Sequence, residues 1–268
     1  METVAIGNLK LSRFILGSNP FSGFSHQTLE MSRRMQHYYT AARIKQTLAQ
    51  AESLGINTVI GRGDHHIIRV LMEYWDEGGR IQWVAQTCQE LGPPEATIDK
   101  AVAYGARAVY IHGGYMDYLL AQGRIGEAPA LIERIHTAGV PAGIAGHNPE
   151  VFRWAERVGP GVDFYTCSYY NMGHRDKQAE HVSGRVEWFL EEDRRIMTEL
   201  IRTLSRPAIH YKVLAAGRND PADAFATVAR SLREGDAVCV GVYTEHRPDM
   251  LAEDVRFFEA SLGRTGGS

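Results

Sequence analysis

The fold is decided by a stretch in the first quarter of the chain that reads Leu54-Gly55-Ile56-Asn57-Thr58-Val59-Ile60-Gly61. An amphipathic segment over Ala41–Leu54 ends at Gly55, and glycine at that position allows the left-handed turn that closes many helices. The β-branched run after the turn is typical of a buried strand. The stretch therefore predicts a helix that turns tightly into a strand.

This helix-to-strand unit recurs along the chain, and two further junctions carry the same glycine, Tyr104-Gly105-Ala106 and Ala138-Gly139-Val140. The predicted strands are Phe14–Ser18, Asn57–Gly61, Ile81–Thr87, Ala108–His112, Val140–Ala145, Asp163–Cys167, Ala208–Leu214 and Ala237–Val242. Helical patterns lie between them, over Ala41–Leu54, Glu95–Tyr104, Ala128–Ala138, Glu150–Val158, Glu187–Leu204 and Asp223–Glu234. This alternation predicts an α/β fold, a (β/α)8 TIM barrel that occupies residues 1–268 as a single domain.

The other architecture with this alternation is a doubly wound open sheet, which usually has a Gly-x-Gly-x-x-Gly turn after its first strand. Here the first strand leads into Gly17-Ser18-Asn19-Pro20-Phe21-Ser22-Gly23, which lacks that pattern. The barrel is therefore favoured over the open sheet.

Composition and charge narrow the classes of function. Of the 268 residues, 44% are hydrophobic and 23% charged, as is ordinary for a globular domain. A formal net charge of −3 offers no excess of positive charge to a nucleic-acid backbone, and no apolar run reaches the length of about 18 residues that suggests a membrane span. Three widely spaced cysteines and no signal-peptide pattern favour a reducing cytosol. We therefore expect a cytoplasmic protein whose partner is a small-molecule substrate, with no nucleic-acid or membrane partner; a homo-oligomer is compatible with these features.

Two long connections interrupt the regular alternation, residues 19–40 after the first strand and residues 168–186 after the sixth. Both follow the C-terminal end of a strand, on the face where TIM barrels build their active sites. Loops of this length in compact domains are often lids or binding loops, so we expect them to border the site. The alternative is a surface elaboration or an oligomer contact.

Polar residues gather at the predicted strand ends, and four of the eight ends carry histidine. Imidazoles and a carboxylate from separate strand ends are suitable ligands for a divalent metal such as Zn²⁺, Mn²⁺ or Fe²⁺. The predicted metal ligands are Asp64, His66, His112 and His147. Two alternatives stay open: these groups act as acids and bases without a metal, or Asp64 only caps the next helix and His66 lies in its exposed first turn.

Other polar residues at the strand ends suit catalysis and substrate binding. Lys212 is predicted to be a Schiff-base nucleophile or the cationic partner of a substrate carboxylate, because a lysine inside a barrel is costly unless it is paired or catalytic. His210 and Glu150 are the other candidate acids or bases. The candidate substrate-binding residues are Arg62, Asn19, Asn148, Tyr169, Asn171 and Arg218.

Several segments together resemble the aldo/keto reductases. The segments that carry the resemblance are Gly7–Gly17, Leu54–Thr58, Ala108–His112, Val213–Arg218, Asp236–Val242 and Ala252–Ala260. The resemblance covers nearly the whole chain, and it implies a (β/α)8 barrel whose bottom is sealed by a turn before strand one. It also implies a substrate pocket to which His112 contributes.

The chain departs from these reductases at their catalytic residues. The family uses an Asp, a Tyr, a Lys and a His together to protonate a carbonyl, and only the His is matched, by His112. Val59-Ile60 stands where the Asp is expected, Cys88 stands where the Lys is expected, and the segment Arg62–His66 contains no Tyr. The nicotinamide-phosphate clamp after strand eight is not matched either. The resemblance therefore describes a divergent member.

Three functions are consistent with the sequence. The first is an enzyme that acts on a small polar or anionic metabolite, such as one derived from a sugar, through metal-assisted lyase, isomerase or hydrolase chemistry. The second is an NADPH-dependent oxidoreductase of the aldo/keto reductase type with a rearranged site. The third is a barrel that binds a metabolite without catalysis. The histidines at the predicted barrel mouth favour the first.

Overall fold

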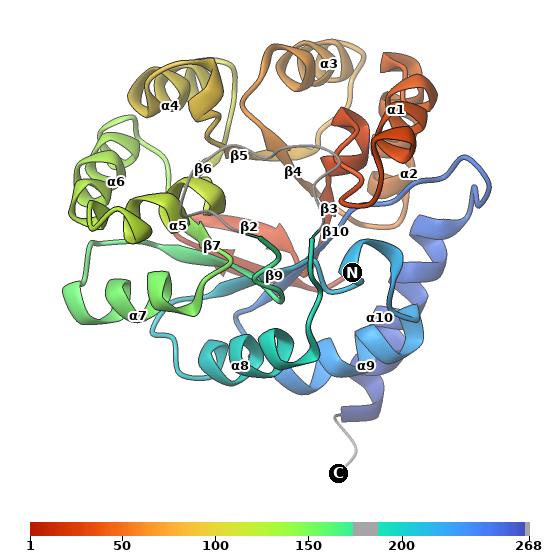
Figure 1. Ribbon diagram of the computed structural model, residues 1–268. Helices are drawn as coiled ribbons and strands as arrows, with labels where there is room; N and C mark the ends of the chain where they lie inside the picture. The colour runs from red at the N-terminus through yellow and green to blue at the C-terminus, as the bar shows by residue number, and fades with distance from the viewer. Residues whose placement is uncertain (174–186, 266–268) are drawn as a thin grey trace.

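The computed structural model describes residues 1–173 and 187–265, and its centre is a closed barrel of eight parallel strands (Figure 1). The strands follow one another around the barrel in chain order, and β10 closes it by pairing with β3. They are β3 (Phe14–Gly17), β4 (Thr58–Arg62), β5 (Gln82–Gln86), β6 (Ala108–Ile111), β7 (Ala142–Gly146), β8 (Phe164–Ser168), β9 (Ala208–Tyr211) and β10 (Ala237–Val240). The predicted TIM barrel is confirmed.

Each predicted strand is present near its expected bounds, and the seventh shows the most informative difference. It is expected to run to Leu214, but β9 ends at Tyr211. Lys212 has a φ of 60°, in the left-handed region that a strand does not use. The backbone therefore turns at Lys212 and leaves the barrel wall there.

Helices surround the barrel on its outside (Figure 1). They are α1 (Leu29–Tyr38), α2 (Ala41–Ser53), α3 (His65–Asp76), α4 (Pro94–Ala103), α5 (Gly113–Ala121), α6 (Ala128–Thr137), α7 (Pro149–Val158), α8 (Glu191–Ile201), α9 (Pro221–Ser231) and α10 (Met250–Thr265). Residues 19–40, expected to be a loop, hold a short 3-10 helix η1 (Asn19–Ser22) and α1, which Thr28 caps by accepting a hydrogen bond from Met31 N. Of the second expected loop, residues 174–186 lie outside the described residues.

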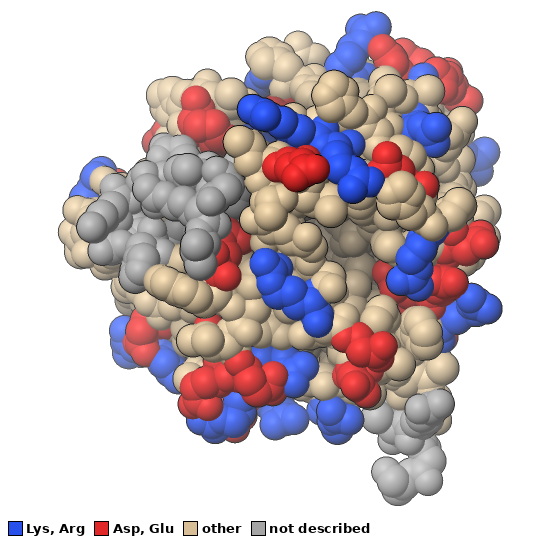
Figure 2. All heavy atoms as spheres, turned by 45° about the vertical axis from the view of Figure 1, so that its right-hand side comes forward, with Lys and Arg blue, Asp and Glu red and all other residues tan. Residues whose placement is uncertain are grey.

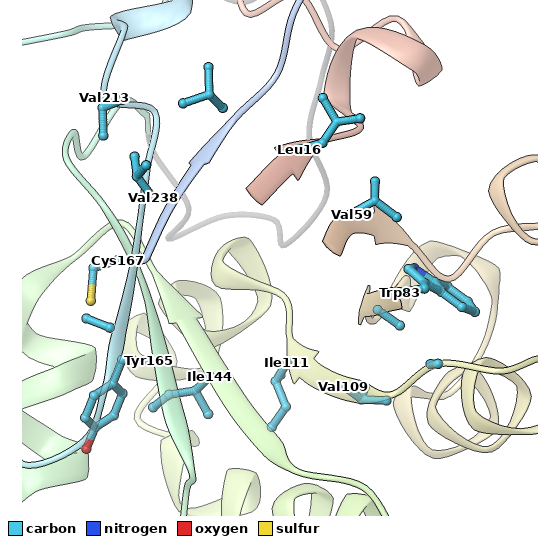
Figure 3. Packing of buried hydrophobic residues seen from close by; sticks show 14 of the residues in the cluster. Leu16, Val59, Trp83, Val109, Ile111, Ile144, Tyr165, Cys167, Val213 and Val238 are labelled. Carbon is cyan, nitrogen blue, oxygen red and sulfur yellow. The ribbon is translucent and has the colours of Figure 1, made fainter. Parts of the chain in front are cut away.

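The strand side chains alternate between the barrel interior and the layer beneath the helices. The interior cluster contains residues such as Ile15, Val84 and Ile209, and Tyr211 packs against it. The outward side chains pack in a larger cluster that also includes residues outside the strands. Figure 3 labels its members Leu16, Val59, Trp83, Val109, Ile111, Ile144, Tyr165, Cys167, Val213 and Val238. Neighbouring residues on one strand therefore meet different surroundings.

The N-terminal end of the barrel is closed by an antiparallel hairpin of β1 (Thr3–Ile6) and β2 (Leu9–Ser12). Gly7 lies in its two-residue turn with a φ of 56°, and a Cβ there would lie 2.7 Å from Pro141 Cγ. Leu9 and Leu11 pack with the interior cluster, so the hairpin covers the bottom of the barrel. The opposite end, where the strands finish, is the end that opens to a cavity.

Charged side chains of both signs are interspersed on the face that Figure 2 shows. Exposed ion pairs also occur on the surface, as between Arg134 and Asp99. None of the described helices is both long enough and apolar enough to cross a membrane.

Candidate active site

A cavity of about 390 Å³ opens at the C-terminal ends of the strands. Barrel-interior side chains such as Ile60, Thr166 and Cys239 line its deep part, and its polar lining includes Asn19, His26, Arg62, Gln86, Tyr110, Tyr211 and Lys212. A smaller pocket of about 40 Å³ shares these polar residues and adds His112 and His147. TIM barrels place their active sites at this end, so we treat the two pockets as one candidate active site.

Lys212 lies in this site and is held by a histidine that is 186 positions away in the sequence. Lys212 Nζ donates a hydrogen bond of 2.8 Å to His26 Nε2, and His26 Nδ1 lies 2.8 Å from Glu187 Oε2. The carboxylate accepts the Nδ1 proton, so the lone pair of Nε2 faces the ammonium group. The side chains of His26 and Glu187 are only 10% and 8% exposed. His26 can therefore accept a proton from the lysine nitrogen.

Backbone strain is concentrated in the same region. Among the described residues, the non-glycine residues with positive φ are His26, Lys212, Ala215 and Ala216. Three of these four line the cavity. Such conformations cost on the order of 1–3 kcal/mol each and cluster at functional sites. The strain therefore supports a functional role for this cavity.

A second series of hydrogen-bonded side chains, formed by Asp117, His147 and Tyr211, also reaches the site. Asp117 on α5 accepts from His147 Nδ1 at 2.7 Å, and Tyr211 Oη lies 3.2 Å from His147 Nε2. Asp117 and His147 are each 5% exposed. Burial raises the pKa of Tyr211 well above its usual value. Tyr211 is therefore a protonated phenol beside Lys212 at neutral pH.

The predicted metal ligands are not brought together. Asp64 caps α3 and accepts a hydrogen bond of 2.9 Å from Ile67 N, and His66 is exposed in the first turn of that helix. His112 and His147 line the smaller pocket without the other two. Within residues 1–173 and 187–265, no three His, Cys, Asp or Glu side chains converge so that they could hold a metal ion. The predicted ligand set is thus corrected to a helix cap, an exposed histidine and two pocket histidines.

His210 is also placed differently from the prediction. It points away from the cavity, where His210 Nε2 lies 3.3 Å from Asp236 Oδ2 and Tyr169 Oη lies 2.9 Å from His210 Nδ1. The inward positions of β9 are Ile209 and Tyr211, so a residue between them must face the helices. Its predicted catalytic role is therefore replaced by a structural one.

Two predicted substrate-binding residues, Asn19 and Arg62, do line the cavity. Arg62 Nε donates to Asp64 Oδ2 at 2.9 Å, its NH2 group contacts Glu90, and the guanidinium lies 4.8 Å from the centroid of the Phe24 ring. These contacts hold Arg62 in a defined position at the edge of the cavity.

The remaining predicted residues lie outside the cavity lining. Glu150 is exposed in the first turn of α7, and Asn148 caps that helix by accepting a hydrogen bond from Glu150 N. Tyr169 is buried against His210, and Asn171 is exposed. Arg218 donates to His26 O at 3.1 Å, so it supports the histidine that contacts Lys212. These residues are polar and follow strand ends, as the lining residues do, so the sequence pattern did not separate the two groups.

Sequence reasoning missed several residues of the site, including His26, Glu187, Asp117 and Tyr211. His26 and Glu187 are 161 positions apart, and Asp117 and His147 are 30 apart, so no local pattern connects them. Tyr211 could have been found from the alternation of β9, because it occupies the same face as Ile209.

The fold is similar to that of solved aldo-keto reductases. A protein of Pseudomonas aeruginosa assigned to the aldo-keto reductases is 18% identical with a TM-score of 0.65, and the match covers 97% of this chain and 96% of that one. Glycerol dehydrogenase of Gluconobacter oxydans is 13% identical with a TM-score of 0.56 (98% and 95% covered). Phospho-2-dehydro-3-deoxyheptonate aldolase of Thermotoga maritima is 14% identical with a TM-score of 0.56 (98% and 74% covered). No protein-family model matches the chain, and no curated protein matches it in sequence. The resemblance to the reductases is thus confirmed at the level of the fold.

Proposed function

We propose that this protein is an enzyme that acts on a small anionic or polyhydroxylated carbonyl compound, with Lys212 as the nucleophile of a lyase or isomerase reaction. The observation that carries the proposal is the position of Lys212 Nζ, which lies in the cavity 2.8 Å from His26 Nε2. A lysine amine that loses a proton to a neighbouring base can attack a carbonyl and form a Schiff base. Lys212 would then polarise the carbonyl, the role for which the sequence suggested a metal.

The charges of the site support an anionic substrate. The described residues that line the smaller pocket include Lys212 and Arg62 and no acidic side chain, and the larger cavity adds Arg247 and Asp254. Arg62 also pairs with Asp64 and Glu90. Cationic groups beside a reacting carbonyl favour a carboxylate or phosphate on the same molecule. Asn19, Gln86 and Tyr110 add groups that can bind substrate hydroxyls. A solved aldolase has a similar fold.

Reductive trapping tests the proposal directly. The protein is incubated with pyruvate or glyceraldehyde 3-phosphate and sodium cyanoborohydride, which reduces a Schiff base to a stable secondary amine. We expect one adduct per chain, mapped by peptide mass spectrometry to Lys212. Mapping is simple because the chain has only five lysines, which are Lys10, Lys45, Lys100, Lys177 and Lys212.

Lys100 provides a matched control for this experiment. Its Nζ also lies against a histidine ring, 2.9 Å from His65 Nε2, but on the exposed surface. Lys212→Arg should abolish the adduct, because a guanidinium does not form a Schiff base, whereas Lys100→Arg should leave it unchanged. An adduct spread over several lysines, or none with either carbonyl, would contradict the proposal.

The shape of the cavity favours a second candidate, the NADPH-dependent reductase. The cavity extends from the barrel interior past Gly17 and Gly241 to Met250 and Asp254 on α10, so it can hold a ligand longer than a small metabolite. Its lining also includes Arg247, which could bind a phosphate. The reductase residues fit less well, because the apolar Ile60 lines the cavity where the family has its Asp.

Titration with NADPH separates the two candidates. The chain has four tryptophans, and bound NADPH absorbs their emission. The reductase candidate requires saturable quenching at micromolar NADPH and none with NADPH fragments that lack the nicotinamide ring. For the Schiff-base enzyme, we expect quenching no greater than that of a tryptophan solution of matched absorbance.

A further inference from the structure

The hydrogen-bonded series Asp117–His147–Tyr211 has no role in the chemistry described so far, although it ends beside Lys212. Tyr211 belongs to β9 and points into the barrel, and Lys212 is the next residue. Lys212 Nζ lies 5.8 Å from the centroid of the Tyr211 ring. Both residues line the larger cavity and the smaller pocket. A carbonyl compound that reaches Lys212 therefore also meets the Tyr211 hydroxyl.

The carboxylate of Asp117 fixes the orientation of His147. Asp117 Oδ1 accepts hydrogen bonds from the backbone N–H groups of His147 and Asn148, both at 3.1 Å, while Oδ2 is 2.7 Å from His147 Nδ1. These bonds place the Nδ1 proton toward Asp117 and leave Nε2 directed at Tyr211 Oη, 3.2 Å away. The ring is therefore held in one orientation and one tautomer.

Gly113 allows this close arrangement. A Cβ at Gly113 would lie 3.2 Å from both His147 Cε1 and Tyr211 Oη, which is tighter than ordinary contact. The glycine begins α5, the helix that also carries Asp117. One helix thus supplies the carboxylate and the space that the histidine and the tyrosine need.

We propose that Tyr211 is the acid that protonates the carbonyl oxygen during attack by Lys212, with His147 as its proton source and Asp117 as the positioning residue. This assignment rests on the proposed function of Lys212. The C–N bond forms and the C–O bond breaks, so water leaves. The ammonium nitrogen gives up two protons through His26, and the departing oxygen receives two from Tyr211. His147 first takes up a proton from solvent at Nε2 while its Nδ1–H stays hydrogen-bonded to Asp117. After each transfer this imidazolium returns the Nε2 proton to the phenolate oxygen, and solvent restores both histidines.

The two hydrogen-bonded chains thus serve opposite atoms of the reacting carbonyl. His26 removes protons from the nitrogen, and Tyr211 adds protons to the oxygen. Positioned acids of this kind typically contribute factors of 10²–10⁴ to a rate. Loss of the Tyr211 hydroxyl should therefore slow the formation of the Schiff base without removing the nucleophile.

The test measures how fast the cyanoborohydride-trapped adduct forms with pyruvate or glyceraldehyde 3-phosphate. Tyr211→Phe should slow its formation on the order of 10²-fold, while the final amount of adduct on Lys212 stays the same. His147→Gln should slow it similarly and serves as the second variant if Tyr211→Phe does not fold. Tyr169→Phe is the matched control, because Tyr169 also bonds a histidine that contacts an aspartate, but outside the cavity.

The positioning role of Asp117 is tested by a measurement that would give a different result if Asp117 were only structural. Asp117→Asn should lower the maximal rate of adduct formation without changing the carbonyl concentration that gives half of it, and Asp117→Glu should recover part of the rate. Equal rates in the wild type and Tyr211→Phe would overturn the role of Tyr211 while leaving Lys212 in place. No adduct in the wild type would overturn the proposed function together with this assignment.

Discussion

Asp236→Ala is expected to destabilise the protein by about 3–5 kcal/mol, because it removes one partner of a buried ion pair. Asp236 is 1% exposed and accepts from Ala208 N at 2.8 Å, from His210 at 3.3 Å and from Arg233 at 2.8–3.0 Å. Its loss leaves a buried imidazole, a guanidinium and a strand N–H group without their acceptor. Urea unfolding at pH 7 measures the difference in the free energy of unfolding.

A matched control distinguishes the loss of the buried Asp236 interactions from the loss of an exposed ion pair. Asp99 also pairs with an arginine, Arg134, but its side chain is 44% exposed. Asp99→Ala should cost no more than about 1 kcal/mol, since exposed pairs contribute little. Equal losses for the two variants would show that the buried network around Asp236 contributes no special stability.

The contribution of Asp236 to the free energy of unfolding should fall as the solution becomes acidic. Burial alone would raise the pKa of Asp236, but the hydrogen bonds from His210 and Arg233 lower it to about 2, below the ordinary 3.8. A carboxyl whose pKa is lower in the folded state stabilises the fold above about pH 4 and loses that contribution as the pH falls toward 2. The contribution is about 2 kcal/mol. The difference between wild type and Asp236→Ala should shrink by that amount over this range.

Unlike Asp236→Ala, Asp254→Asn is expected to raise the free energy of unfolding relative to wild type, and only at higher pH. Asp254 is 3% exposed, and its Oδ2 atom is buried with no hydrogen-bond partner among the described residues. Burial raises the pKa of this carboxyl from 3.8 to about 7. The folded protein therefore binds a proton between pH 4 and 7 that the unfolded chain releases, so the free energy of unfolding falls as the pH rises through that range.

Asparagine removes the charge, so the substitution should cancel this loss. Relative to wild type, Asp254→Asn should gain up to about 4 kcal/mol more in the free energy of unfolding at pH 8 than at pH 4. Comparing the two pH values cancels the constant effect of the amide. Asp249→Asn, at an exposed position before the same helix, should show no such difference. A gain that does not depend on pH would contradict the raised pKa of Asp254.

Local patterns predicted some of the polar residues near the barrel mouth, but not which of the predicted residues enter the cavity. Asn19, Arg62 and Lys212 line it, and His112 and His147 reach the smaller pocket. On β9 the sequence suggested His210 and Lys212 as catalytic residues. The structure turns Tyr211 inward instead, and Lys212 enters the cavity because its φ of 60° ends the strand.

The sequence by itself determined the barrel, because patterns among neighbouring residues predict its eight strands and the helices α2, α4, α6, α7, α8 and α9. Only the tertiary structure decided the candidate site. Lys212 meets His26 from 186 positions away, and Tyr211 meets His147 from 64 positions away. Closing the barrel brings these strand ends together, and the pairing of side chains across its mouth depends on strand register and backbone direction rather than on spacing along the chain.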